Sequence, residues 1–152
     1  MFTLVPSQFF DPAAAREALA EVAPLKGDEQ VGYLDIPQYD AVLVYATDGD
    51  SVVVAPPAVS ELLTRLPACP EYNKILCNRH DGRLDLAVAQ GKSLLLANSF
   101  PAPDFTTAEY YLFLSLNTLQ LNPEISTVCW LSPLSEEDKM SLYRYFKSVV
   151  QL

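Results

Sequence analysis

The chain has 152 residues, of which 50% are hydrophobic and 19% charged, and 19 Asp and Glu against 10 Lys and Arg give it a net charge of -9. This composition is too hydrophobic for a disordered chain and too interrupted by polar residues for a membrane span. No cluster of Lys or Arg offers the phosphate contacts that nucleic acids and anionic membranes require, so we expect no nucleic-acid partner and no membrane insertion.

The first residues and the cysteines bear on the cellular compartment. The opening MFTLVPSQFF lacks the basic region and cleavage site of a secretory signal, so a cytoplasmic location is expected. The three cysteines have no CxxC spacing and lie in apolar segments. We interpret Cys69, Cys77 and Cys129 as buried thiols and not as a disulfide framework.

The first third of the chain predicts a strand, a helix and two further strands. Residues 2–5 form a short apolar run. Asp11 followed by Pro12 has the pattern of a helix N-cap with proline at the first helical position, so a helix should run to about Val22. The two later strands are expected at residues 31–36 and 41–46.

A boundary between two modules is expected in the middle of the chain. Asp48-Gly49-Asp50 is a turn signal, and Pro56-Pro57 cannot continue a central strand because proline has no amide donor. We therefore expect two domains, residues 1–55 and residues 56–152.

The second module should open with a helix over residues 58–66, which Pro67 ends, and should continue with three strands. The strands are expected at residues 74–79, 84–89 and 93–99. Asp81-Gly82 and Gln90-Gly91-Lys92 between them are turn signals, because glycine tolerates positive φ. This part of the chain therefore predicts an antiparallel meander.

Two helices and one strand should follow the meander. Thr106 and Glu109 have the spacing of a capping box, and the helix that they predict is apolar almost all round. A strand is expected at residues 125–131, and a last helix should begin at Ser135. Its apolar stripe is Leu142, Phe146, Val149 and Val150. The predicted order is βββαβα, and the fold class is mixed α/β.

Several segments resemble a known family. They are Leu94-Leu95-Leu96-Ala97-Asn98-Ser99-Phe100 with the following Asp104 and Tyr110-Tyr111, and the opening Phe2-Thr3-Leu4-Val5-Pro6 with Phe9-Phe10. Together they resemble the DUF3822 family of uncharacterised Bacteroidetes proteins over most of the chain.

This resemblance implies an architecture, because the family is similar to actin-like ATPases. Those proteins contain two ribonuclease H-like halves, and some carry a strand-helix-strand-strand insert called the SHS2 module. Residues 1–55 would then be an SHS2-like β-α-β-β module, and residues 56–152 an incomplete ribonuclease H-like half. We further expect a shortened form or a fragment that lacks the first half and ends before the last strand and helix of the second.

The resemblance also implies a candidate nucleotide site. In actin-like proteins each half supplies a hairpin that contacts phosphate, and the matching turn here runs from His80 to Asp85. It keeps one Asp-Gly pair but lacks the later glycine and hydroxyl residue of the family pattern. Asp81, Gly82 and Asp85 are therefore candidate residues for ATP with Mg²⁺, and otherwise no cofactor is expected. The competing interpretation is an ordinary turn, with His80 solvated beside it.

The sequence shows no catalytic pattern. It contains no GxxxxGK[ST], GxGxxG, GxSxG or HExxH motif, and a single histidine excludes a His-rich metal site.

Aromatic side chains on the predicted helices suit either the core or an interface. The candidate interface residues are Tyr110, Tyr111, Phe113 and Tyr143.

Three hypotheses for the function remain open at this stage. The first is a non-enzymatic protein-interaction or scaffold protein on a degenerate actin-like framework, with a protein partner or a second copy of itself, as a homodimer. The second is a nucleotide-binding actin-like protein that uses the Asp81-Gly82 hairpin. The third is a small hydrolase whose site carries no known pattern.

Overall fold

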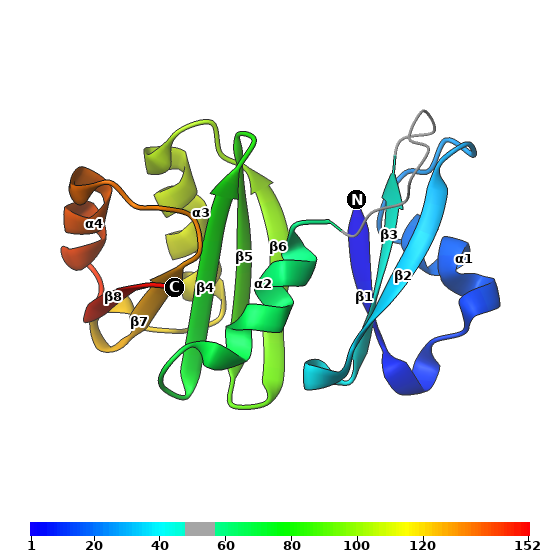
Figure 1. The fold of residues 1–152 in the computed structure, drawn as a ribbon, viewed down its shortest axis with the longest axis horizontal. Helices are drawn as coiled ribbons and strands as arrows, with labels where there is room; N and C mark the ends of the chain where they lie inside the picture. The colour runs from blue at the N-terminus through cyan, green and yellow to red at the C-terminus, as the bar shows by residue number, and fades with distance from the viewer. Residues whose placement is uncertain (48–56) are drawn as a thin grey trace. The chain divides into compact units, whose positions relative to one another are not determined.

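The computed structural model describes residues 1–47 and 57–152, and the chain divides into two compact units, Met1–Ser60 and Glu61–Leu152 (Figure 1). The predicted turn at residues 48–50, the run at residues 52–54 and Pro56 of the expected boundary lie outside the described residues. Each unit has its own sheet, and the whole is mixed α/β, as predicted.

The first unit is a three-stranded antiparallel sheet with one helix. Its strands, in the order β1-β3-β2, are β1 (Phe2–Pro6), β2 (Gln30–Ile36) and β3 (Ala41–Thr47). Asp11 caps the turn Pro12–Ala14 as predicted, since its carboxylate accepts a hydrogen bond of 3.0 Å from the backbone N–H of Ala13. That turn is a 3-10 helix, and α1 proper is only Ala15–Ala20, so the helix ends before Val22.

The core of this unit lies between α1 and one face of the sheet. Because strand side chains alternate between faces, Val42 and Val44 of β3 point to the same side. They pack there against Ala15 and Leu19 of the helix. Phe10 adds a ring contact with Tyr33, with centroids 5.0 Å apart. The small number of buried side chains makes this a thin core.

The second unit is built on a five-stranded mixed sheet in the order β6-β5-β4-β7-β8. The predicted meander is present as three antiparallel strands, and two parallel strands extend it on the β4 side. Their bounds are β4 (Asn73–His80), β5 (Arg83–Gln90), β6 (Ser93–Pro101), β7 (Thr127–Trp130) and β8 (Ser148–Gln151).

Three helices accompany this sheet among the described residues. They are α2 (Val59–Arg65), α3 (Phe105–Thr118) and α4 (Glu136–Tyr143). In Figure 1, α3 and α4 lie on one side of the five-stranded sheet and α2 on the other. The larger core lies on the α3 and α4 side, and Trp130 is its largest fully buried side chain. No helix in the described part of the chain combines the length and apolar character that a membrane crossing needs.

Two further local predictions, both in the second unit, are wrong. Asp104, not Thr106, caps α3, because its carboxylate accepts a 2.7 Å hydrogen bond from the backbone N–H of Thr107. The last helix does not continue to Val150. It ends at Tyr143, and Val149 and Val150 belong to strand β8 beside β7. A short apolar run fits a helix stripe as well as a buried strand, and here parallel pairing with β7 decides for the strand.

Candidate functional site

The turn between β4 and β5 is a tight two-residue hairpin. Asp81 has φ 48° and Gly82 has φ 69°, so both central residues are left-handed, as a type I′ turn requires. The carbonyl of Gly82 accepts a hydrogen bond of 2.8 Å from the N–H of Ala102, just after β6. The Asp-Gly pair is therefore explained first by turn geometry.

His80 and Asp85 form a close pair across this hairpin. His80 Nε2 lies 2.6 Å from Asp85 Oδ2, while Nδ1 lies 3.4 Å from Asp81 Oδ2. Asp85 is only 2% exposed, so this is a buried carboxylate with a histidine partner. The expectation of a solvated His80 holds only in part, because about a third of its side chain is exposed while its Nε2 is paired with buried Asp85.

The charge of this pair depends on pH. Partial burial lowers the pKa of His80, but the hydrogen bond and negative charge of Asp85 act against it, with Asp81 contributing in the same direction. The net result is a pKa for His80 above its ordinary value. The protonated form of His80 is consequently favoured up to a higher pH than in a free imidazole.

A cavity of 330 Å³ lies beside the hairpin, at the ends of β4 and β7 and the beginnings of α3 and α4. Parallel strands bring their carboxyl ends to the same edge, which is why residues far apart in the sequence meet there. Its walls include an arginine, a histidine, two carboxylates and the rings of a phenylalanine and a tryptophan. The lining residues are Arg79, His80, Asp81, Gly82, Phe105, Trp130, Ser132, Pro133, Leu134 and Asp138.

Two buried donors of this lining have no hydrogen-bond acceptor among the described residues. They are the indole Nε1 of Trp130 and the Nε of Arg79. Trp130 is 1% exposed, so its N–H has been removed from water without compensation. The rest of Arg79 is held in place, since its backbone N–H donates to Ser132 Oγ at 3.0 Å and its Nη2 to the carbonyl of Pro103 at 3.5 Å.

The three residues predicted for nucleotide and Mg²⁺ lie on one hairpin, but only two of them line the cavity. Asp81 and Gly82 line the cavity, and the side chain of Asp81 is 96% exposed. Asp85 is not part of the lining and is directed to His80. Within residues 1–47 and 57–152, no group of three or more His, Cys, Asp or Glu side chains is arranged to hold a metal ion.

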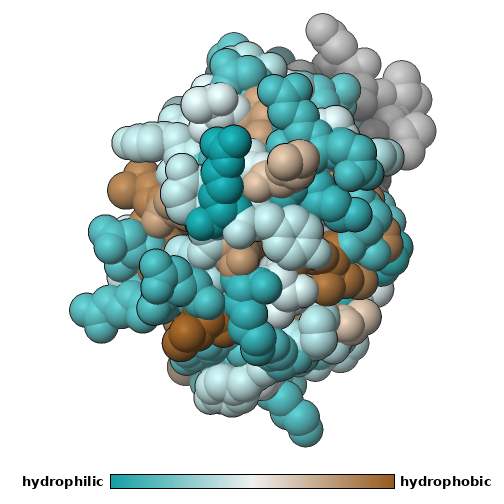
Figure 2. Space-filling view, turned by 90° about the vertical axis from the view of Figure 1, so that its left-hand side faces the viewer, coloured by the Kyte–Doolittle hydropathy of each residue, from teal (hydrophilic) through white to brown (hydrophobic). Residues whose placement is uncertain are grey.

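The four predicted interface residues also fall into two groups. Tyr110 and Tyr143 are 60% and 50% exposed on α3 and α4. Tyr111 stacks on Phe100 with centroids 4.7 Å apart, and Phe113 contacts Tyr145 at 4.8 Å, so these two rings belong to the packing beneath. On the face in Figure 2, hydrophobic residues form separate patches between hydrophilic ones.

Comparison with known proteins identifies the family. The model of DUF3822, described as a protein of unknown function, matches residues 55–149. The chain belongs to this family. A search of curated proteins finds no match for this DUF3822 member.

One solved structure is similar to this DUF3822 chain over almost its whole length. It is a Bacteroides thetaiotaomicron protein described as having an actin-like ATPase fold and unknown function, with a TM-score of 0.78 and 19% sequence identity. The match covers 99% of this chain and 64% of that structure, so the chain spans less than two thirds of the neighbour's length. At this identity the similarity establishes the actin-like fold alone, as predicted.

Sequence reasoning about this DUF3822 chain missed most of the cavity lining. Phe105, Trp130 and Asp138 come from three elements that follow the meander, and none belongs to a motif. A usable signal was present in the βαβ order, because a strand that pairs in parallel with β4 must end beside the β4–β5 hairpin. That pairing was not predicted, so the hairpin was considered without its neighbours.

Proposed function

We propose that this chain acts by binding and not by catalysis, as a protein-interaction or scaffold protein on a degenerate actin-like framework. The observation that carries the proposal is the 2.6 Å contact between His80 and the buried carboxylate of Asp85. A hard cation such as Mg²⁺ needs carboxylate oxygens that are free to coordinate it. Here His80 is paired with Asp85, one of the two candidate carboxylates of the hairpin, so Asp81 is the candidate that remains for a cation.

The interaction surface that we propose is the outer face of α3 and α4. The two helices are linked by a 2.6 Å hydrogen bond from Ser141 Oγ to Glu109 Oε1, and Phe113 of α3 contacts Tyr145 just after α4. These contacts hold the two helices together, and the exposed side chains of this face project from them. They are Tyr110, Leu114, Met140, Tyr143 and Tyr145, each between 45% and 64% exposed. Tyrosine and methionine are enriched at protein interfaces.

The oligomeric state tests this surface, with a second copy of the chain as the proposed partner. Light scattering after size-exclusion chromatography should report a dimer for the wild type and a shift to monomer for a Tyr110→Ser, Tyr143→Ser double variant. Tyr33→Ser is the matched control, since Tyr33 is 51% exposed on β2 and belongs to the other compact unit. A wild type that stays monomeric, or a double variant that still dimerises, would contradict the proposal of self-association through this face.

The cavity favours a second candidate function, the binding of a nucleotide. Its volume of 330 Å³ lies within the range of small-molecule sites, and the lining includes Arg79, whose guanidinium group suits a phosphate oxygen, and the ring of Trp130. Asp81 could share a Mg²⁺ ion with the phosphates, because such ions are often held by one or two carboxylates together with the substrate.

Thermal unfolding with and without Mg-ATP or Mg-ADP separates the two candidates. Ligand at about 100 times its dissociation constant stabilises a protein by about 2.7 kcal/mol, which is a rise in Tm of roughly 5 to 10 °C for a chain of this size. The nucleotide proposal expects this rise, and expects Asp81→Ala and Trp130→Phe to reduce it. Asp28→Ala is a control in the other unit. An unchanged Tm would leave only the interaction proposal.

We also propose that the two compact units correspond to the modules implied by the family resemblance. The strand-helix-strand-strand order of the first unit supports an SHS2-like assignment for residues 1–55. The meander followed by α3, β7, α4 and β8 supports a ribonuclease H-like assignment for residues 56–152. Expression of residues 57–152 alone tests this, since an independent half should unfold cooperatively.

A further inference from the structure

The cavity beside the β4–β5 hairpin is lined by two opposite charges that no ion pair neutralises. They are the guanidinium group of Arg79, near the end of β4, and the carboxylate of Asp138, in the first turn of α4. The ion pairs in the described part of the chain include neither residue. Asp104 interacts electrostatically with Arg79, but its carboxylate caps α3 by accepting a 2.7 Å hydrogen bond from the N–H of Thr107.

The other ionisable side chains of the lining are engaged with each other. His80 contacts the carboxylate of Asp85 at 2.6 Å and that of Asp81 at 3.4 Å. Asp81 therefore has the imidazole as its partner. One cation and one anion of the lining, Arg79 and Asp138, remain without a counter-charge in the described part of the chain.

Both of these residues are held by hydrogen bonds of their own. The backbone N–H of Arg79 donates to Ser132 Oγ at 3.0 Å, and its Nη2 donates to the carbonyl of Pro103 at 3.5 Å. The backbone N–H of Asp138 donates to the hydroxyl of Ser135, the cap of α4, at 3.1 Å. Groups that are already positioned lose little conformational freedom when a ligand binds, which favours affinity.

The rest of the lining is largely apolar, with Phe105, Trp130, Pro133 and Leu134. The rings of Phe105 and Trp130 pack with centroids 5.5 Å apart, and Trp130 is 1% exposed, so this wall is part of the core. The volume of 330 Å³ is at the lower end of the range of small-molecule sites, which is about 300–1,000 Å³. The cavity thus suits a small molecule that carries both charges and an apolar group.

We propose that this cavity binds a free amino acid with a large apolar side chain, such as phenylalanine or leucine, in its zwitterionic form. The ligand carboxylate pairs with Arg79, because a guanidinium group forms strong charge-assisted hydrogen bonds with carboxylates. The ligand ammonium group pairs with Asp138, and the apolar side chain lies against Phe105 and Trp130. The proposal goes beyond the interaction surface on α3 and α4, and it names a ligand class other than the nucleotide considered for the same cavity.

The single tryptophan is a direct reporter of this cavity. Because the chain has one tryptophan, Trp130 gives one indole N–H signal in a nitrogen–proton correlation NMR spectrum, and its shift during a titration yields the Kd. Phenylalanine is compared with phenethylamine, which lacks the carboxylate, and with hydrocinnamate, which lacks the ammonium group. We expect a saturable shift with phenylalanine, and binding weaker by about tenfold or more for each analogue, because each loses one charge-assisted hydrogen bond.

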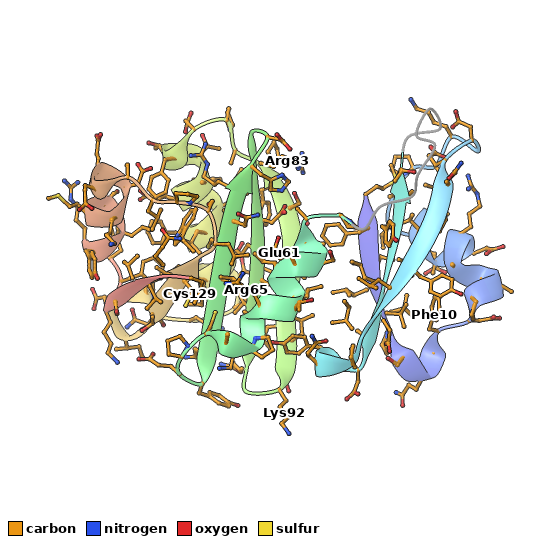
Figure 3. All side chains as sticks on the ribbon, in the orientation of Figure 1. Phe10, Glu61, Arg65, Arg83, Lys92 and Cys129 are labelled. Atoms are coloured by element: carbon orange, nitrogen blue, oxygen red, sulfur yellow. The ribbon has the colours of Figure 1, made fainter. Side chains whose placement is uncertain are left out.

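Two variants assign the charges. Arg79→Met should weaken the binding of phenylalanine and hydrocinnamate by about tenfold or more and leave that of phenethylamine unchanged. Asp138→Asn should weaken phenylalanine and phenethylamine but not hydrocinnamate. Arg83→Met is the matched control, since Arg83, which Figure 3 labels, lies on the same hairpin outside the lining and donates to Ser99 Oγ at 2.8 Å. Circular dichroism checks that the variants are folded.

The analogues on the wild type keep the test decisive even if a variant does not fold. An indole signal that moves with neither phenylalanine nor leucine, or equal affinities for phenylalanine and its two analogues, would overturn the proposal. Folded Arg79 and Asp138 variants that bind phenylalanine as tightly as the wild type would do the same. A saturable shift with Mg-ATP and none with an amino acid would favour the nucleotide instead. Self-association is measured separately by light scattering, so none of these outcomes decides it.

Discussion

The two hairpins of the meander lie at opposite ends of strand β5 and have a similar turn. Arg83 marks the first hairpin and Lys92 the second in Figure 3. Each contains a glycine with positive φ, Gly82 at 69° and Gly91 at 56°. Their surroundings differ. The second hairpin lies against Tyr72, whose carbonyl accepts a 2.9 Å hydrogen bond from the N–H of Gly91.

The first hairpin instead meets the ends of other elements. It carries the His80–Asp85 pair and borders the cavity that Trp130 and Phe105 help to line. The comparison shows that a turn signal predicts the turn in both cases and says nothing of function in either. What makes one hairpin a candidate site is the parallel strand β7 beside β4, which ends at the first hairpin and not at the second.

The largest expected effect is that of Trp130→Ala, which removes the buried ring beneath the first hairpin. Trp130 is 1% exposed and packs against Phe105 with centroids 5.5 Å apart. Large-to-small changes of this kind cost about 3–5 kcal/mol of the free energy of unfolding. Urea unfolding followed by circular dichroism measures it.

Trp130→Phe is the matched control for this change. It keeps most of the ring but removes the indole N–H, which finds no acceptor in the described part of the chain. Its cost should be well below that of Trp130→Ala, because no hydrogen bond is lost. Equal losses in the two variants would show that the indole nitrogen has a structural partner.

The sequence predicts much of the first hairpin's fold and little of its site. The meander, the Asp-Gly turn and the cap at Ser135, whose hydroxyl accepts from the N–H of Asp138, follow from local chemistry. The contact of His80 with Asp85 follows from the register of the hairpin, which makes the two residues diagonal neighbours across the strands. The cavity depends on pairing between β4 and β7, about 50 residues apart, for which local patterns carry no signal.

Asp85→Asn should have the next largest effect. It leaves the shape of the residue but removes the buried charge opposite His80. Hydrogen bonds to charged groups contribute about 1.5–3 kcal/mol, and we expect a loss of this order in urea unfolding. Asp81→Asn, on the same hairpin but with an exposed side chain, should change the stability by no more than about 0.5 kcal/mol. Similar losses in the two variants would contradict the distinction between them.

The two glycines allow the hairpins to be compared directly. Alanine in the left-handed region costs about 1–2 kcal/mol, so Gly82→Ala and Gly91→Ala should both destabilise the protein. A Cβ at Gly82 meets nothing within 4 Å, while one at Gly91 lies 3.0 Å from the ring of Tyr72. Gly91→Ala should therefore cost a few tenths of a kcal/mol more. In a Tyr72→Ala background this difference should disappear, and a difference that persists would place its cause elsewhere.

The smallest effect concerns the pH dependence of the first hairpin, which the second hairpin lacks. His80 is the single histidine of the chain, so its pKa can be followed by one set of imidazole signals in an NMR titration. We expect a pKa above the ordinary value of 6.5 in the wild type, and a lower pKa in Asp85→Asn because the partner charge is lost.

The sign of the stability change follows from this shift. Because the pKa of His80 is higher in the folded state, its pairing with Asp85 stabilises the protein fully below the unfolded pKa of 6.5. This contribution is lost as the pH rises through the folded pKa. Urea unfolding between about pH 6 and about pH 9 should therefore show a decline that Asp85→Asn and His80→Gln both reduce. A decline of the same size in both variants would assign the pH dependence to groups outside the hairpin.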